Sequence, residues 1–284
     1  MSAPPATASP VPLTHPWPVR LWRGVQLVWA RLASRDGYVE ARAAPFDLTF
    51  TGPGADCIMR HIHRLGAHEP EMSRYLLDHV RLGPDDVAFD VGANLGWYSV
   101  LLDRLSAPGA RIFAFEPDPE SYRLLLGNLA ANGATRVTAV NQALGASPGS
   151  AELYRYRRTN IGKHSLLNRN TEGQVRVPVT TLGDFWEREG LRGKSIRFLK
   201  VDVEGYEYFV LQGAGDLLRR CVCVQLEYSP DSFPPAGLDA SAMIKLLTAA
   251  GLRASVFVNG ELRPISYPDL ARLDSQHDLI LTPA

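Results

Sequence analysis

The sequence predicts an α/β domain built on a mainly parallel sheet, with a smaller segment in front of it. Short, continuously apolar runs recur along the chain and alternate with stretches of helical periodicity. This alternation is typical of parallel strands that helices cover on both faces. The chain has 284 residues, of which 45% are hydrophobic. It can therefore bury a large core without a disulfide or metal staple.

The N-terminal region differs in composition from the rest. Residues 1–18 are rich in Pro, Ala, Ser and Thr, so we expect a disordered tail. Residues 19–68 form a predicted helical and strand extension. Within it, residues 20–34 carry apolar side chains at helical spacing, with Trp22 and Trp29 one heptad apart, which predicts an amphipathic helix. Such a helix can pack on its own domain, or it can contact a membrane surface, a partner or a second copy in a homo-oligomer.

The main domain is expected over residues 69–284, beginning with a helix at 69–80. The chain closes with two predicted strands, 255–258 and 278–282, which can carry an antiparallel edge of the sheet. Residues 150–180 differ from the rest, because short alternating pieces flank a polar loop, and we expect an inserted β-hairpin there. The other predicted strands are 87–91, 111–116, 136–140, 195–201 and 221–228, and the other predicted helices are 95–105, 119–131, 181–189 and 239–250.

Charge and cysteine content exclude several classes of protein. Thirty basic and thirty acidic residues cancel, which argues against a nucleic-acid-binding protein. No apolar stretch approaches the length of a membrane span, and the N-terminus lacks the pattern of a secretory signal. Three cysteines give no disulfide framework, so we expect a cytoplasmic protein. Cys221 and Cys223 are expected on one face of a strand, as core residues.

The strongest motif is VAFDVGANLGWYS, residues 87–99. A strand ends at Asp90, a glycine-containing turn follows, and a helix begins. Ligands of open α/β sheets bind at the carboxyl ends of the strands. Gly92 lets the chain turn sharply and approach a ligand, and Gly96 lets the next helix pack close to the strand. Asp90 can accept a hydrogen bond from an ammonium group or a water, although a purely structural turn would look similar.

Two details narrow the ligand. Asn94 stands where the dinucleotide fingerprint Gly-x-Gly-x-x-Gly has its second glycine, and its side chain would hinder a pyrophosphate. Glu116 ends the next strand, where a carboxylate can accept hydrogen bonds from both hydroxyls of a ribose. These features favour a ligand with a ribose but no pyrophosphate. S-adenosylmethionine (SAM) meets that description, and its ammonium group suits the acidic turn.

A third motif, FLKVDVEGYE, places Lys200, Asp202 and Glu204 at alternate positions near the end of a strand. A period of two puts the three side chains on one side of an extended backbone. Charged groups are costly to bury unless they are paired or used. They can form a structural ion-pair network, position a substrate, remove a proton, or hold a divalent metal through Asp202 and Glu204.

Taken together, these segments resemble FkbM-type SAM-dependent methyltransferases over roughly residues 69–230. The resemblance implies a Rossmann-like class I methyltransferase fold, with a seven-stranded, mostly parallel sheet and an antiparallel last strand. It also implies methyl transfer from SAM to a hydroxyl oxygen of a natural product, sugar or lipid. The segments that carry it occur in the family's order: DVGANLGWYS, FAFEPDPESYRLLLGNLAANG, NQALGASPGSAEL, TTLGDFW and LKVDVEGYEYFVLQGA.

The resemblance implies roles for individual residues as well. Glu116 would hold the ribose, Gln142 would contact the adenine, and Glu69 would close over the cofactor. Glu204 is assigned to the substrate, and Ser165, on a loop that varies in such proteins, is assigned there too. The remaining cofactor residues implied are Asp90, Gly92, Ala93, Asn94, Gly96, Pro117 and Asp202.

A hydroxyl is a weak nucleophile, so methyl transfer to it calls for a general base. Asp202 and His164 are the two candidates for this base, and Lys200 is grouped with them as catalytic. His164 has a suitable pKa but lies on a loop whose structure the sequence does not define. We expect Asp202→Asn to lower turnover at least tenfold while SAM still binds.

The segment CIMRHIHRLGAH combines Cys57 with His61, His63 and His68, but no pair has a reliable zinc spacing. We expect a surface or substrate-access element there, and no metal site. Two other functions fit parts of the pattern. An NAD-dependent oxidoreductase would share the sheet, but Asn94 counts against it. A catalytically silent binding module would share the fold, but the acidic residues at the strand ends count against that.

Overall fold

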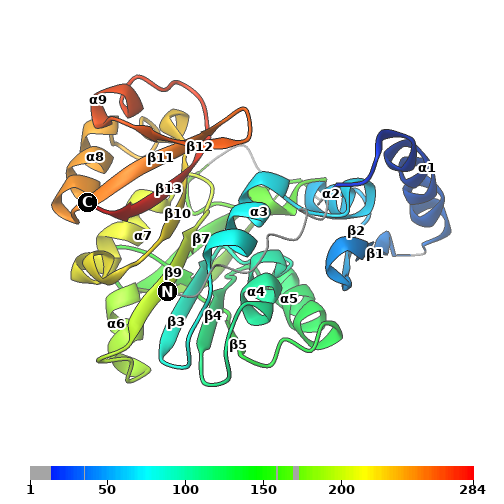
Figure 1. The fold of residues 1–284 in the computed structure, drawn as a ribbon, viewed down its shortest axis with the longest axis horizontal. Helices are drawn as coiled ribbons and strands as arrows, with labels where there is room; N and C mark the ends of the chain where they lie inside the picture. Colours follow the sequence, from blue (N-terminus) through cyan, green and yellow to red (C-terminus); the bar gives the residue numbers. More distant parts are fainter. Residues whose placement is uncertain (1–13, 35, 158, 169–172) are drawn as a thin grey trace, which may run out of the picture.

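The computed structural model describes residues 14–34, 36–157, 159–168 and 173–284. The predicted tail therefore lies mostly outside the described residues, and its last two residues already belong to the first helix. The centre of the fold is an eight-stranded mixed sheet in the order β12-β11-β13-β10-β9-β3-β4-β5 (Figure 1). Its strands are β3 (Asp86–Val91), β4 (Arg111–Phe115), β5 (Val137–Val140), β9 (Ser195–Val201), β10 (Val224–Tyr228), β11 (Leu252–Val258), β12 (Glu261–Ile265) and β13 (His277–Pro283).

The order and direction of the strands confirm the predicted fold class. Five neighbouring strands of the sheet, β10, β9, β3, β4 and β5, run parallel. Strand β13 lies between β10 and β11 and is antiparallel to both. The predicted count of seven is short by one, because β12 adds an antiparallel edge to β11. Strand β12 was not predicted because it contains Pro264 and its side chains are exposed or partly exposed, so it does not form an apolar run. Proline is tolerated on such an edge strand.

Helices cover both faces of the sheet (Figure 1). On one face, α3 (Pro70–His79), α4 (Trp97–Arg104) and α5 (Pro119–Ala131) share a hydrophobic cluster with the sheet. On the other face, α6 (Leu182–Arg188), α7 (Glu207–Ala214) and α8 (Ala240–Ala249) share a second cluster. A last short helix, α9 (Tyr267–Leu270), precedes β13. Two packed faces hold the strand ends rigidly in place.

The predicted hairpin insertion is confirmed. β7 (Gly149–Arg155) and β8 (Gly173–Thr180) pair antiparallel, and β6 (Ala143–Leu144) joins β8 to make a separate three-stranded sheet. Arg155 ties this sheet to the main domain, since its Nε lies 2.5 Å from Asp118 Oδ2. The hairpin therefore stands beside the carboxyl ends of the central strands.

The N-terminal extension contains α1 (Trp17–Ala33), the antiparallel hairpin of β1 (Tyr38–Ala43) and β2 (Leu48–Pro53), and α2 (Cys57–Leu65). Two asparagines, Asn128 in α5 and Asn132 directly after it, bond to backbone groups on the free edge of β2. Asn128 Oδ1 accepts from Thr51 N at 2.7 Å, and Asn132 Oδ1 accepts from Thr49 N at 2.9 Å. These bonds fix the hairpin to the domain, because an exposed strand edge otherwise leaves its backbone groups without protein partners.

One sequence prediction about the core is wrong in its geometry. Strand β10 begins at Val224, so Cys221 and Cys223 precede it instead of sharing one strand face. Both are buried, as expected of core residues, but Cys221 packs in the cluster with α6 to α8 and Cys223 in the cluster with α3 to α5. Within the described residues, no helix combines the length and apolar character needed to cross a bilayer.

Candidate active site

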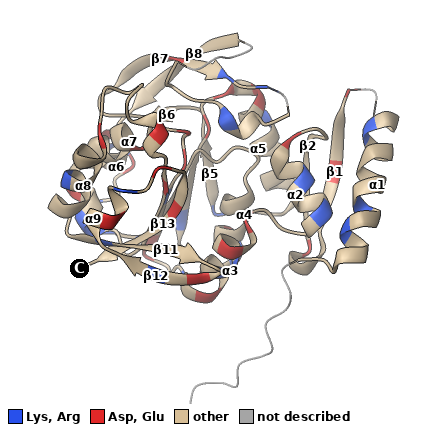
Figure 2. Cartoon of the chain, turned by 90° about the horizontal axis from the view of Figure 1, so that it is seen from above, with Lys and Arg blue, Asp and Glu red and all other residues tan. Residues whose placement is uncertain are grey.

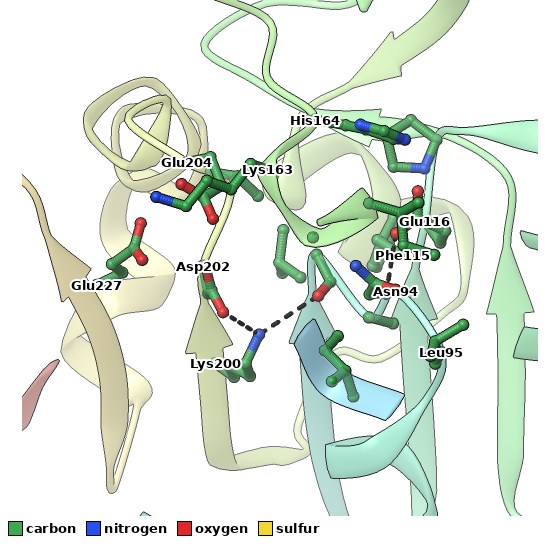
Figure 3. A pocket seen from close by; sticks show the side chains of 18 of the residues that line it. Asn94, Leu95, Phe115, Glu116, Lys163, His164, Lys200, Asp202, Glu204 and Glu227 are labelled. Carbon is green, nitrogen blue, oxygen red and sulfur yellow. Dashed lines mark hydrogen bonds and ion pairs between the residues drawn. The ribbon is translucent and has the colours of Figure 1, made fainter. Parts of the chain in front are cut away.

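A cavity of about 250 Å³ lies at the carboxyl ends of β3, β4 and β9. Residues of the β3–α4 turn, of the hairpin loop and of α2 line it, and Figure 3 shows Asn94 of the turn and Lys163 of the loop among its side chains. This is the edge of the sheet at which open α/β folds bind ligands. Most of the residues predicted from the sequence line it: Glu69, Gly92, Ala93, Asn94, Glu116, Pro117, Gln142, His164, Lys200, Asp202 and Glu204.

The β3–α4 turn is tightly constrained. Gly92 has a φ of +81°, and a Cβ there would lie 1.8 Å from the carbonyl oxygen of Asp202. Only glycine therefore allows the turn to pass the end of β9 this closely. The backbone N–H groups of Gly92 and Ala93 donate to the carbonyl oxygen of Phe115, at 3.1 and 2.9 Å. The turn is thus fastened to the strands on both of its sides.

Glu116 lies at one end of the cavity and is held by the backbone. Its Oε2 accepts from Asn94 N and its Oε1 from Asp118 N, both at 2.9 Å. Each carboxylate oxygen has a second acceptor site that can still take a hydroxyl. Burial raises the pKa of Glu116 to about 7, against the effect of the two N–H donors. This carboxyl group is therefore oriented in advance to receive a pair of hydroxyls.

Three predicted residues do not line the cavity. Asp90 is fully buried below it, where Ser99 Oγ donates to its Oδ2 at 2.6 Å. The direct contact with an ammonium group that we predicted for Asp90 therefore does not match its position. Gly96 faces α5 instead, where a Cβ would lie 2.7 Å from Leu125. Ser165 is buried and donates to the carbonyl oxygen of Glu204 at 2.8 Å, so it anchors the loop rather than facing a substrate.

Lys200 supplies positive charge below the cavity. Its Nζ lies 3.0 Å from Asp202 Oδ2 and 3.8 Å from Asp90 Oδ1, and donates to the carbonyl oxygen of Gly92 at 3.3 Å. Burial alone would lower the pKa of this amine, but the carboxylates around it raise the pKa above its usual value. Lys200 therefore stays protonated, and it serves as a counter-ion instead of a base.

Glu69 reaches the same region from the start of α3. Tyr98 donates its hydroxyl to Glu69 Oε2, and His68 Nε2 lies 3.1 Å from Glu69 Oε1. Burial works to raise the pKa of Glu69, but His68, Lys200 and the Tyr98 hydroxyl lower it to about 2. Glu69 is therefore a permanent negative charge on the cavity wall.

A cluster of three carboxylates occupies the end of the cavity opposite Glu116. One carboxylate oxygen from each of Asp202, Glu204 and Glu227 lies within 4.8 Å of the other two. Glu204 has a φ of 56°, so it lies beyond the end of β9, but it still belongs to this cluster. Glu227 was not predicted, because it lies inside an apolar run that reads as core. Burial, together with Asp202 and Glu204, raises its pKa well above the usual value.

Such a cluster can take a proton, and its oxygen ligands are of the kind that hard divalent cations prefer. Glu227 Oε2 is buried and has no hydrogen-bond partner among the residues that the structure describes. Lys200 already neutralises part of the charge on Asp202. Within the described residues, this is the one group of three or more whose ligand atoms lie close enough to share an ion.

The hairpin loop brings His164 to the Glu116 end of the cavity. Figure 3 shows the imidazole near Glu116, across the cavity from Asp202 and Glu227. Tyr156 N donates to His164 Nδ1 at 2.9 Å, and burial lowers the histidine pKa. A neutral ring at this end of the cavity is poorly placed to share a substrate proton with the carboxylate cluster.

Residues from α2 complete the wall. Asp56 caps this helix, and its Oδ2 also accepts from Ile161 N at 3.0 Å, which ties the hairpin loop to α2. Cys57, His61 and His68 line the cavity, with 3.4 Å between the Nδ1 atoms of the two histidines. His63 does not line it. The segment is thus a wall of the cavity, in line with the substrate-access interpretation.

Comparisons with known proteins identify the family of this chain. The profile of the family described as "Methyltransferase FkbM domain" matches residues 90–254. A hexuronic acid methyltransferase of Haloferax volcanii is 30% identical over 66% of this chain and 71% of its own length. A 31-O-demethyl-FK506 methyltransferase of Streptomyces tacrolimicus is 31% identical over 50% of this chain and 64% of its own length. A solved putative methyltransferase of Streptococcus mutans, in complex with SAH, aligns with 75% of this chain and 96% of its own at a TM-score of 0.42 and 9% identity.

Proposed function

Because the chain belongs to the FkbM methyltransferase family and is a SAM-dependent O-methyltransferase with a small-molecule acceptor, we propose that the cavity described above is its active site. Family membership does not favour an NAD-dependent oxidoreductase or a silent binding module. The observation that carries the proposal is the pair of contrasting carboxylate sites at opposite ends of one cavity (Figure 3). One site suits a ribose, and the other suits a hydroxyl that must lose a proton.

Glu116 holds the ribose in this proposal, because the backbone fixes both of its oxygens and leaves each with a free acceptor site. Gln142 and Pro117 line the same cavity, and this proposal places them beside the adenine of the cofactor. The negative charge of Glu69 attracts the positively charged end of the cofactor. Asp90 acts from below, by pairing with Lys200, which in turn bonds to the carbonyl oxygen of Gly92 at the start of the β3–α4 turn.

Bound SAM supplies a methyl group on a positively charged sulfur, and a hydroxyl oxygen of the acceptor displaces that sulfur as it loses its proton. Asp202 accepts the proton in this proposal. Its side chain is 29% exposed, so it can touch the acceptor, whereas Glu227 lies deeper and is 4% exposed. Lys200 holds Asp202 in place, and Glu227 lies beside it in the carboxylate cluster. General-base assistance of this kind contributes about 10²–10⁴-fold.

The acceptor class is proposed from chemistry and from the named relatives. A carboxylate cluster suits a polyhydroxylated acceptor, because carboxylates accept several hydroxyl hydrogen bonds. The two curated relatives named above are described as acting on a hexuronic acid and on a demethylated FK506. We therefore propose a sugar-like or polyketide-like hydroxyl compound as the methyl acceptor of this chain.

Asp202→Asn tests this assignment. With any acceptor found in a methyl-transfer screen, we expect turnover to fall at least tenfold, while SAM binds with nearly unchanged affinity in calorimetry. His164→Gln is the matched comparison, and its turnover should fall less. Near-normal turnover of Asp202→Asn would remove Asp202 from the mechanism. Activity that EDTA abolishes and Mg²⁺ restores would instead assign the carboxylate cluster to a divalent cation.

A further inference from the structure

Helix α1 presents its apolar side chains to solvent. Of the eleven large hydrophobic residues that are exposed in the described part of the chain, eight lie on this one helix. Their exposed fractions range from 37% for Val19 to 73% for Trp17 and Leu32. A contiguous exposed apolar face of this kind marks an interaction site on a folded protein. The eight residues, called the α1 stripe below, are Trp17, Val19, Leu21, Trp22, Val25, Val28, Trp29 and Leu32.

The face of α1 toward the protein is small and polar by comparison. Leu27 is the only residue of this helix that is buried. Arg20 and Arg23 are partly buried, and they donate to the carbonyl oxygens of His15 at 2.6 Å and Arg42 at 3.5 Å. Helix α1 therefore packs on its own domain, against α2 and β1, but most of its apolar side chains lie outside that contact. The amphipathic pattern instead faces outward.

The charges on helices α1 and α2 are of one sign, and the acidic Asp36 lies beside Val28 and Leu32 at one end of the α1 stripe. Helix α1 contains three arginines and no acidic residue, and α2 behind it adds Arg60 and Arg64 and no acidic residue. Arg64 is close to α1, since a Cβ on Gly24 would lie 3.7 Å from its Nε. Figure 2 shows α1 and α2 together at one end of the molecule, with basic residues on both. A second copy of this helix would bring like charges together, whereas an anionic surface would be attracted.

We propose that α1 docks the protein on an anionic lipid surface, with the α1 stripe in the boundary between headgroups and acyl chains. Three tryptophans suit this boundary, because the indole ring is apolar and its N–H can hydrogen-bond to headgroups or water. Arg31, which is exposed next to Leu32 of the stripe, can reach the phosphates. A helix of 17 residues lies in the plane of the boundary.

The docked helix is also close to the cavity. Helix α2 packs against α1, while Cys57, Ile58 and His61 at the start of α2 line the cavity. One helix therefore separates the docking face from the active site. The docking itself does not depend on methyl transfer, so its test can fail or succeed independently of the proposed function.

Vesicle sedimentation tests the proposal with the full chain. We expect binding to vesicles of phosphatidylcholine with 30% phosphatidylglycerol, a blue shift of tryptophan fluorescence, and much weaker binding to phosphatidylcholine alone. The double variant Trp22→Glu/Trp29→Glu should lose at least tenfold in affinity. Arg31→Glu should lose about fivefold or more on the anionic vesicles, since each basic residue near such a surface contributes about that factor.

A matched control places charge on exposed apolar residues elsewhere. Leu126→Glu/Val258→Glu changes side chains that are 46% and 40% exposed on other surfaces, and it should bind vesicles as the unmodified chain does. SAM calorimetry shows whether each variant is folded. Equal vesicle binding by the two double variants overturns the proposal. The proposal is also overturned if the unmodified chain does not bind vesicles but forms a concentration-dependent dimer that Trp22→Glu/Trp29→Glu dissociates. In that case the α1 stripe would bind a second copy of the chain.

Discussion

The two ends of the cavity use carboxylates in opposite ways. At one end, Glu116 is a single buried carboxyl group that two backbone N–H groups hold in place. At the other end, Asp202, Glu204 and Glu227 crowd together, and Lys200 is paired with Asp202 from below. The first arrangement limits motion, because backbone donors are fixed by the strands and the turn. The second concentrates negative charge and proton affinity.

This difference separates binding from chemistry within one pocket. A carboxylate that is fixed in advance loses little freedom when a ligand arrives, so its hydrogen bonds contribute to affinity. A crowded cluster is costly while it stands alone, because its like charges repel. A positively charged cofactor, or a proton from a substrate, relieves that repulsion. Changes at the two ends should therefore alter different measurements.

The largest effect is expected from Lys200→Met, and it should appear in stability. The change leaves Asp90 and Asp202 without the buried cation between them. Removing one partner of a buried ion pair costs about 3–5 kcal/mol, to be read from the free energy of unfolding in urea at pH 7. The loss should shrink at lower pH, where Asp90, whose pKa burial raises, takes up a proton.

Lys194→Met is the matched control, because Lys194 pairs with Asp85 on the surface. Exposed ion pairs contribute up to about 1 kcal/mol to the free energy of unfolding. If Lys200→Met costs no more than this control, Lys200 is not the counter-ion on which the acidic end depends.

The next effect concerns the Glu116 end and should appear in affinity. Glu116→Gln replaces one acceptor oxygen with an amide that faces a backbone N–H donor. Hydrogen bonds to charged groups contribute about 1.5–3 kcal/mol, so calorimetry should show SAM binding that is weaker by roughly 10-fold to 150-fold. Glu187→Gln, an exposed change on α6, should leave the affinity unchanged. Equal SAM affinities for the two variants would show that Glu116 does not bind the ribose.

The sequence could predict the fold because burial leaves a strong pattern in it. Continuous apolar runs identified the strands β3, β4, β5, β9 and β10 of the central sheet, whereas the missed strand β12 has no buried residue. Glu116 and Asp202 were placed correctly on the cavity wall because strand ends fix their positions. The direction of a side chain is not fixed in this way. Asp90 and Ser165 lie in the expected segments, but their side chains point to internal partners.

Glu227 was missed for a related reason. It lies in CVCVQLEY, whose apolar pattern indicates a buried strand, and β10 is indeed buried throughout. A carboxylate at the end of such a strand was the available signal, since an unpaired buried charge is costly. The outward face of α1 shows the same limit, because periodicity identifies an apolar face but does not say what covers it.

The smallest effect is a pH dependence of SAM affinity that should come from the Glu116 end alone. Burial raises the pKa of Glu116 to about 7, so below pH 7 the free protein holds a proton there and one oxygen no longer accepts a hydroxyl freely. Above pH 7 the carboxylate is ionised and accepts both. The SAM affinity should therefore rise several-fold between pH 6 and pH 8, and binding at pH 7 should release protons, because the bound state favours the ionised form. Calorimetry in two buffers of different ionisation enthalpy measures this release, and Glu116→Gln should abolish both effects. A pH dependence that survives in Glu116→Gln would place the titrating group among the other carboxylates and would contradict the division of roles between the two ends.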